Sequence, residues 1–262
     1  MQEKREDDKK RETEIARLQE LIAGARRIVG FTGAGISTES GVPDFRTPGS
    51  PWMQNKPIPF PEFVRSPLVR REAWRRKFAM DDIYSHAPPA RAHKAIARLI
   101  AEARMPAVIT QNIDGLHQAA GAPAEAVIEL HGNGTYAACL DCGEHHALAP
   151  IRAHFEAHGD PPDCSACGGI VKTATISFGQ GMPVAAMARA KALAEEADLF
   201  LVLGSSLVVY PAAALPVLAR KSGARLVIVN RQPTELDDLA DLVVHTEIGP
   251  LVDRLFLQED NQ

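Results

Sequence analysis

The sequence lacks an excess of basic residues, an apolar N-terminal stretch and any cysteine outside a closely spaced pair. Its formal net charge of −4 argues against an electrostatic footprint for nucleic acid, so we expect no direct nucleic-acid partner. Residues 1–13 are dense in charges of both signs and nearly free of apolar side chains, unlike a secretory signal. We therefore expect a cytoplasmic protein whose first 13 residues form a disordered or frayed lead.

A long uncharged stretch covers residues 199–219 and would suffice in length to span a bilayer. However, Gly204-Ser205-Ser206 interrupts it, and Pro211 and Pro216 follow. These breaks favour a buried strand, a loop and a helix over a membrane helix. We accordingly expect no membrane partner. We also expect the protein to act as a monomer.

Short apolar strands alternate with helices along most of the chain. Apolar runs predict buried strands at residues 27–31, 107–110, 126–130, 199–203, 226–230 and 242–245. Helical spacing and proline-led starts predict helices over residues 14–24, 68–80, 89–103, 183–196, 211–221 and 249–256. This alternation is typical of an α/β fold with a parallel, doubly wound sheet, whose ligands bind at the carboxyl ends of the strands.

Two Cys-x-x-Cys pairs predict a metal site. The pairs are Cys139 with Cys142 and Cys164 with Cys167. Four thiolates supply the soft tetrahedral shell that Zn²⁺ prefers, and a full shell leaves no open position, so we expect a structural zinc ion. Two redox-active pairs are the alternative.

A glycine-rich turn follows the first predicted strand at residues 33–37. Glycines allow a backbone to approach a pyrophosphate closely, and a following helix N-terminus favours its charge. A full G-x-G-x-x-G would require glycine at position 38, where this chain has Thr38. Taken alone, the turn is equally consistent with a tight strand–helix connection.

Several further strings occur in a characteristic order: GVPDFR at 41–46, TQNIDGLH at 110–117, HG at 131–132, the cysteine pairs, FG at 178–179 and GSSL at 204–207. Together with the turn at 33–37 they resemble the sirtuin family, and the resemblance covers about residues 28–248. It implies an NAD-dependent protein lysine deacetylase or deacylase that consumes NAD and acts on acyl-lysine proteins or peptides. The products would be nicotinamide, free lysine and O-acyl-ADP-ribose.

The resemblance also implies a division of the chain. A Rossmann-like NAD-binding domain would comprise residues 14–46, 91–133 and 176–262. A helical insert would cover residues 47–90, and a small zinc-ribbon domain residues 134–175. NAD and the acyl-lysine would meet in the cleft between these parts.

By the same resemblance, the NAD contacts come from loops that follow the strands. They are Gly33, Ala34, Gly35, Ser37, Asp44, Phe45, Arg46, Gln111, Asn112, Ile113, Asp114, Gly204, Ser205, Ser206, Asn230 and Ile248. Phe45 would exclude water from the reactive centre, and Arg46 would supply a fixed charge. From the residues alone, the same string is a proline-initiated turn, and Asp114 begins an Asx turn.

His131 is the expected general base, assisted in catalysis by Asn112 and Asp114. A neutral imidazole near pH 7 suits removal of a proton from a ribose hydroxyl. A hydrogen-bonded structural histidine is the alternative reading of a single His, and it is the role that we expect for His117. The substrate peptide is expected to add as a strand at Phe178, Gly179 and Val208.

Two positions depart from the family pattern. Gln180 stands where an acid usually follows Phe-Gly, and Ser205 where a threonine is frequent. The first change could alter peptide preference, whereas the second keeps a hydroxyl. Two other functions remain open at this point: ADP-ribosyl transfer or NAD hydrolysis in the same pocket, and a zinc-ribbon binding module.

Overall fold

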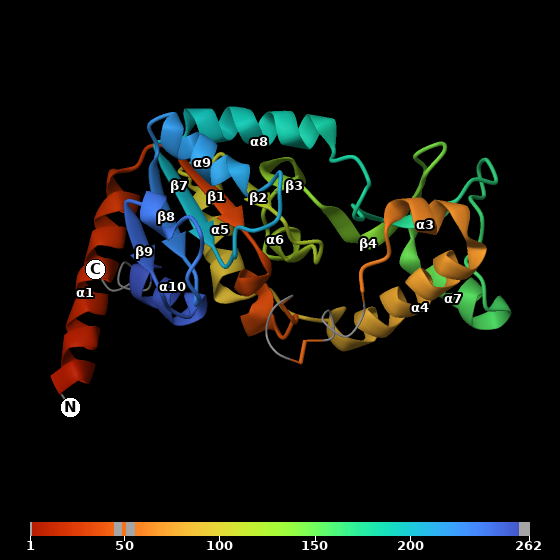
Figure 1. Ribbon diagram of the computed structural model, residues 1–262, viewed down its shortest axis with the longest axis horizontal. Coiled ribbons are helices and arrows are strands. Elements are labelled where there is room, and N and C mark those ends of the chain that lie inside the picture. Colours follow the sequence, from red (N-terminus) through yellow and green to blue (C-terminus); the bar gives the residue numbers. More distant parts are fainter. Residues whose placement is uncertain (1, 45–48, 51–55, 257–262) are drawn as a thin grey trace.

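A parallel sheet of six strands forms the larger of two bodies in the computed structural model, which describes residues 2–44, 49–50 and 56–256 (Figure 1). Its strands are β1 (Ile28–Thr32), β2 (Ala107–Thr110), β3 (Val127–Glu129), β7 (Leu199–Leu203), β8 (Arg225–Val229) and β9 (Leu242–Val244). Every neighbouring pair is parallel. The expected doubly wound α/β sheet is confirmed.

The strand order, β3-β2-β1-β7-β8-β9, fixes where a ligand can bind. From β1 the chain builds outward through β2 to β3, and it then returns to place β7 on the other side of β1. Strand order therefore reverses between β1 and β7. In open α/β sheets, the crevice beyond the carboxyl ends of the strands at such a switch point is the usual ligand site.

Helices cover both faces of the sheet because the strand side chains alternate. Leu199, Leu201 and Leu203 of β7 face one apolar cluster, and Phe200 and Val202 face the other. The first cluster is completed by α1 (Gln2–Gly24), α5 (Arg91–Ala101) and α10 (Ile248–Phe256). The second is completed by α8 (Val184–Glu196) and α9 (Ala214–Lys221).

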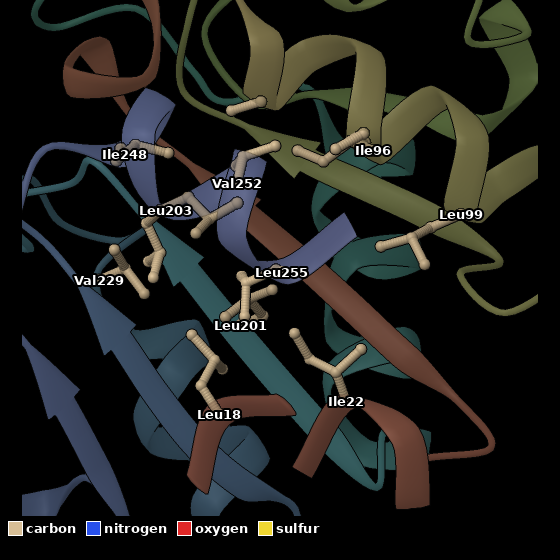
Figure 2. Close-up of a pocket in the computed structure, with 13 residues that line it drawn as sticks. Leu18, Ile22, Ile96, Leu99, Leu201, Leu203, Val229, Ile248, Val252 and Leu255 are labelled. Carbon is tan, nitrogen blue, oxygen red and sulfur yellow. The ribbon is translucent and has the colours of Figure 1, made fainter. Parts of the chain in front are cut away.

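Apolar side chains from α1, α5 and α10 converge with those of β7 and β8 on an internal cavity of about 20 Å³ (Figure 2). Leu18, Ile96, Leu201 and Val252 are among the residues lining it. The lining is entirely apolar, so nothing there could hold a water molecule or a polar ligand. We interpret this cavity as a packing gap in the core.

The N-terminal segment differs from the expected frayed lead, because α1 begins at Gln2. Glu, Lys, Arg and Gln dominate the segment, and all four are good helix formers. Lys10 lies 3.8 Å from Glu14, one helical turn later, and Glu12 pairs with Arg254 of α10. For Lys10 and Glu12, then, the charge has a partner in the folded chain.

The smaller body joins the helical insert to the cysteine segment. An antiparallel sheet in the order β5-β4-β6 is formed by β4 (Gly132–Cys139), β5 (His145–Ala147) and β6 (Val171–Thr175). Around it lie α3 (Phe60–Arg65), α4 (Pro67–Tyr84) and α7 (Leu148–His158). Trp74 stacks on Phe78 at 5.4 Å between ring centroids, and Phe78 meets Phe155 at 5.5 Å. These rings share one apolar cluster with Cys139 and Cys164.

The remaining elements are short: the 3₁₀ turns η1 (Ala34–Ser40), η2 (Ala124–Ala126) and η3 (Asp237–Leu239), and the helix α6 (Leu116–Ala119). The uncharged stretch over residues 199–219 divides into β7, a loop and the first part of α9. Within the described ranges, no helix combines the length and the apolar character needed to cross a membrane.

Candidate active site and metal centre

Two glycine turns meet at the switch point. The backbone N–H of Gly33, just after β1, donates to the carbonyl of Leu203 (3.2 Å), and that of Gly35 donates to the carbonyl of Gly204 (2.8 Å). A Cβ atom on either Gly33 or Gly35 would lie 2.8 Å from the Gly204 oxygen, closer than real Cβ contacts. Only glycine fits at these positions, and Ala34 lies between them. The turn is therefore shaped by its contact with the β7 loop.

Ser37 is the centre of a buried hydrogen-bond network. Its hydroxyl donates to Asp114 Oδ2 (2.7 Å) and accepts from Asn112 Nδ2 (3.1 Å), which also donates to the Gly33 carbonyl (3.1 Å). Asp114 Oδ1 accepts the N–H of Leu116 (3.0 Å), so the Asx turn anticipated at the start of α6 is present as well. The structure thus places three predicted site residues in direct contact.

Gln111 connects the ends of two neighbouring loops. Its Nε2 donates to Ser205 Oγ (2.7 Å), in the loop after β7, and the Ile113 carbonyl accepts the N–H of Gly134 (2.7 Å). Ser205 is buried and Ser206 half-buried. These bonds hold together the loops after β2 and β7 and the first residues of β4.

His131 lies beside the loop after β2 and has a defined tautomer. Its Nδ1 is 3.0 Å from the carbonyl oxygen of Gln111, which can only accept, so Nδ1 carries the proton and Nε2 has a free lone pair. Burial lowers the pKa of His131, and the bond to Gln111 partly opposes this shift. The imidazole is therefore neutral near pH 7, as a general base requires.

Two further buried histidines lie next to the hydrogen-bond network around Ser37. His93 Nδ1 accepts the Ala90 N–H (3.1 Å), so its Nε2–H points to Ser37 Oγ at 3.4 Å. Burial lowers the pKa of His117 to about 3, and its Nε2 contacts Thr32 Oγ1 at 2.9 Å. His117 is thus packed as a structural histidine. Sequence reasoning did not single out His93, because a histidine in the first turn of a helix carries no spacing signal.

The four cysteines form a single cluster. Their sulfur atoms all lie within 4.8 Å of one another, and no other group of three or more potential ligands occurs among the described residues. The pKa of Cys139 is lowered to about 7, first by a backbone hydrogen bond at Cys142, whereas that of Cys167 is raised to about 12, first by its contact with the Cys142 thiol. Four thiols this close suit a divalent cation, and the set fits a closed structural zinc site.

The remaining predicted cofactor residues are more dispersed. Asn230 follows β8, and its Nδ2 donates to the carbonyl of Gln232 (2.7 Å). Ile248 is buried at the start of α10. Phe45 and Arg46 lie outside the described residues. Asp44 is described, and its Oδ2 lies 3.5 Å from Nη2 of Arg231. Arg231 was not predicted from the sequence, although it directly follows Asn230.

The predicted peptide positions are exposed at the surface. Phe178 is 64% exposed and Val208 37%, large values for apolar side chains. Gly179 has φ +81°, in the left-handed region that favours glycine. Gln180 Oε1 accepts the N–H of Ser177 (3.1 Å) and closes this turn. A glutamate could make the same bond, so the departure at 180 removes a charge without removing the turn contact.

Comparison with known proteins adds a second line of evidence. The sequence model described as the Sir2 family matches residues 33–211. The NAD-dependent protein deacetylase of Rhodopseudomonas palustris is 56% identical over 235 residues, which cover 90% of this chain and 93% of that protein.

Solved structures point to the same family as the sequence comparison. The structure of Sir2Tm bound to a propionylated peptide has a TM-score of 0.82 at 36% identity, covering 95% of this chain and 99% of that one. A Sir2 variant with a deacetylated p53 peptide and 3′-O-acetyl-ADP-ribose has a TM-score of 0.84 at 36% identity, covering 94% and 98%.

Proposed function

The chain belongs to the Sir2 family, and from this premise we propose that it is an NAD-dependent protein deacylase acting on acyl-lysine side chains. NAD is consumed in the reaction, which yields nicotinamide, free lysine and O-acyl-ADP-ribose. The observation that carries the proposal is the placement of His131: its Nε2 is free, its ring is neutral, and it lies beside the loops of the switch point.

Different residues bind the pyrophosphate and the nicotinamide end of NAD. Gly33, Ala34 and Gly35 hold the pyrophosphate, and Asn112, Asp114 and their partner Ser37 form the pocket for the nicotinamide end. The acyl oxygen of the substrate attacks the ribose carbon as nicotinamide leaves. Proximity supplies much of the rate enhancement, because an amide oxygen is a poor nucleophile.

His131 acts next. Its Nε2 takes the proton of a ribose hydroxyl, so that the hydroxyl oxygen can attack the acyl carbon, and water then releases free lysine. The hydrogen bond from Nδ1 to the Gln111 carbonyl keeps Nε2 unprotonated and stabilises the imidazolium that forms.

The peptide is held at the exposed Phe178, Gly179 and Val208, where its backbone adds as a strand. The propionylated peptide of one relative, and the deacetylated peptide with 3′-O-acetyl-ADP-ribose of another, support small acyl groups as substrates for this chain too. A structural zinc ion at Cys139, Cys142, Cys164 and Cys167 stabilises the smaller body and takes no part in the chemistry.

The test is mass spectrometry of the purified protein with NAD and an acetyl-lysine peptide. Loss of the acetyl group, together with stoichiometric nicotinamide and acetyl-ADP-ribose, is the expected result. NAD consumption with the peptide still acetylated would indicate hydrolysis or ADP-ribosyl transfer instead. A protein that leaves NAD intact would contradict the proposed function.

A further inference from the structure

A second cavity, of about 340 Å³, opens beside the glycine turn. Its wall includes Gly35 and Ile248, both of which are expected to contact the dinucleotide. The charged residues in the wall are Glu39, Arg91, Arg231 and Glu247. A ligand in this cavity therefore meets two acidic and two basic side chains.

Each arginine of the cavity is already held by two carboxylates. Arg91 pairs with Glu39 and Asp253. Arg231 reaches Glu247 through Nη1 (3.3 Å) and Asp44 through Nη2 (3.5 Å). The two guanidinium groups thus face four carboxylates, and neither is available to a new anion unless an existing ion pair breaks.

This arrangement matters for the choice of dinucleotide. NADP differs from NAD by a phosphate on the 2′ oxygen of the adenosine ribose, and NADP sites commonly present an arginine to that phosphate. Arg231 directly follows Asn230, the residue expected to hold this ribose, so Arg231 is placed to bind a 2′-phosphate. Instead, Arg231 is paired with Glu247 and Asp44, and the negative charges of these two carboxylates repel a phosphate.

We propose that Glu247 is a specificity-determining residue: by holding Arg231 and adding negative charge, it makes the site select NAD over NADP. The proposal rests on the proposed function, because it assumes that the adenosine ribose lies at Asn230. Neutralising Glu247 removes one of the carboxylates that hold Arg231 and one negative charge from the cavity wall, so affinity for NADP rises while affinity for NAD changes little.

The test is a set of dissociation constants for NAD and NADP, measured by calorimetry on the full chain. Wild type binds NAD more tightly than NADP. Glu247→Gln narrows the ratio of the two constants by about tenfold, the value of one charge-assisted hydrogen bond, and does so by tightening NADP. Adding Arg231→Ala to Glu247→Gln removes the gain, because the phosphate then lacks its partner.

Glu196→Gln is the matched control. Glu196 pairs with Arg27, and its side chain is 54% exposed against 59% for Glu247. This pair lies at the amino ends of the strands, since Arg27 directly precedes β1. Glu196→Gln changes the net charge by the same amount as Glu247→Gln, and it leaves the ratio of the NAD and NADP dissociation constants at the wild-type value.

A ratio unchanged by Glu247→Gln, or one shifted equally by Glu196→Gln, overturns the assignment to Glu247. Wild-type NADP binding as tight as NAD binding overturns it as well. Wild type that binds neither dinucleotide overturns the proposed function and the selectivity together, whereas NAD binding with an unchanged ratio overturns the selectivity alone.

Discussion

The role proposed for His131 depends on one neighbour and on burial as well as on its residue type. The Gln111 carbonyl fixes which nitrogen carries the proton, and burial keeps the ring neutral. His117 shows the contrast: its Nε2 is taken up by Thr32, and its Nδ1 has no hydrogen-bond partner. One histidine therefore has a free basic nitrogen at the crevice, and the other is part of the core.

His131→Ala should lower the deacylation rate by about 100- to 10,000-fold, the usual contribution of a general base. NAD affinity should be retained, because the glycine turn does not depend on the imidazole. Rates from the mass-spectrometric assay and NAD titration by calorimetry measure both. His158→Ala, an exposed histidine at the end of α7, is the control. Loss of NAD binding in a folded His131→Ala protein would contradict the assigned role.

The pH dependence follows from the direction of the shift. Neutral His131 is the active form, so the rate should fall as the pH drops through its folded-state pKa. Because burial lowers that pKa from 6.5, the acidic limb of kcat should have its midpoint below 6.5, and more than half of the maximal rate should remain at pH 6.5. A midpoint clearly above 6.5 would assign the limb to another group.

Gly204→Ala should weaken NAD binding. Gly204 has φ +65°, and an added Cβ would lie 2.4 Å from the Ile36 nitrogen, which would push apart the turns after β1 and β7. Gly223→Ala is the matched control, since φ is +103° but no atom lies within 4 Å of the added Cβ. Both changes should destabilise the protein by about 1–3 kcal/mol through backbone strain. Only Gly204→Ala should change the NAD dissociation constant.

At the scale of elements, the sequence predicted most of the larger body. Buried parallel strands are almost wholly apolar, so β1, β2, β7 and β8 were visible as short runs. The smaller body was less visible, because its core is completed by zinc-binding cysteines and by distant rings such as Trp74. The extent of α1 was missed, since a dense run of charges looks like a disordered tract when contacts such as that of Glu12 with Arg254 of α10 are unknown.

The candidate site was also predictable only in part. Residues that follow strands, such as Gly33, Asn112 and His131, could be predicted from motif strings. The supporting contacts could not, because they join segments far apart in sequence: Gln111 to Ser205, His93 to Ser37 and Arg231 to Glu247. Tertiary geometry alone brings these pairs together.

Leu18→Ala should destabilise the protein by about 2–5 kcal/mol. Leu18 is fully buried where α1 packs on the sheet, and it already borders the small cavity of Figure 2, so truncation enlarges a gap that cannot collapse easily. Arg17→Ala, one residue earlier and exposed in a pair with Glu20, should stay within about 0.5 kcal/mol of wild type. Urea unfolding followed by circular dichroism measures both. Equal effects would mean that α1 is not docked as described.

On the scale of the whole molecule, β4 links the two bodies. It begins at Gly132, next to His131, and ends at the zinc-site residue Cys139. The cysteine cluster therefore supports the strand that begins beside His131, the proposed catalytic base. The smaller body has little apolar core of its own, so metal binding should supply much of its stability.

Zinc removal should unfold the smaller body and leave the larger sheet intact. Trp74 reports this directly, because it is 1% exposed in the cluster that contains Cys139 and Cys164. In a Trp52→Phe background, a chelator or Cys164→Ala should shift the Trp74 emission to longer wavelength. The far-ultraviolet signal of the larger body should persist. Unchanged emission after complete zinc loss would show that the apolar cluster holds without the metal.

The shared core of α4, α7 and the cysteine segment has a consequence for recombining this protein with its relatives. Trp74 and Phe78 come from the insert, whereas Phe155, Cys139 and Cys164 come from the segment over residues 134–175. A chimera that exchanges only one of the two stretches would place mismatched halves of a core against each other. The two stretches form one inheritable unit although residues 91–133, which belong to the other body, separate them in the chain, and viable crossovers should exchange them together.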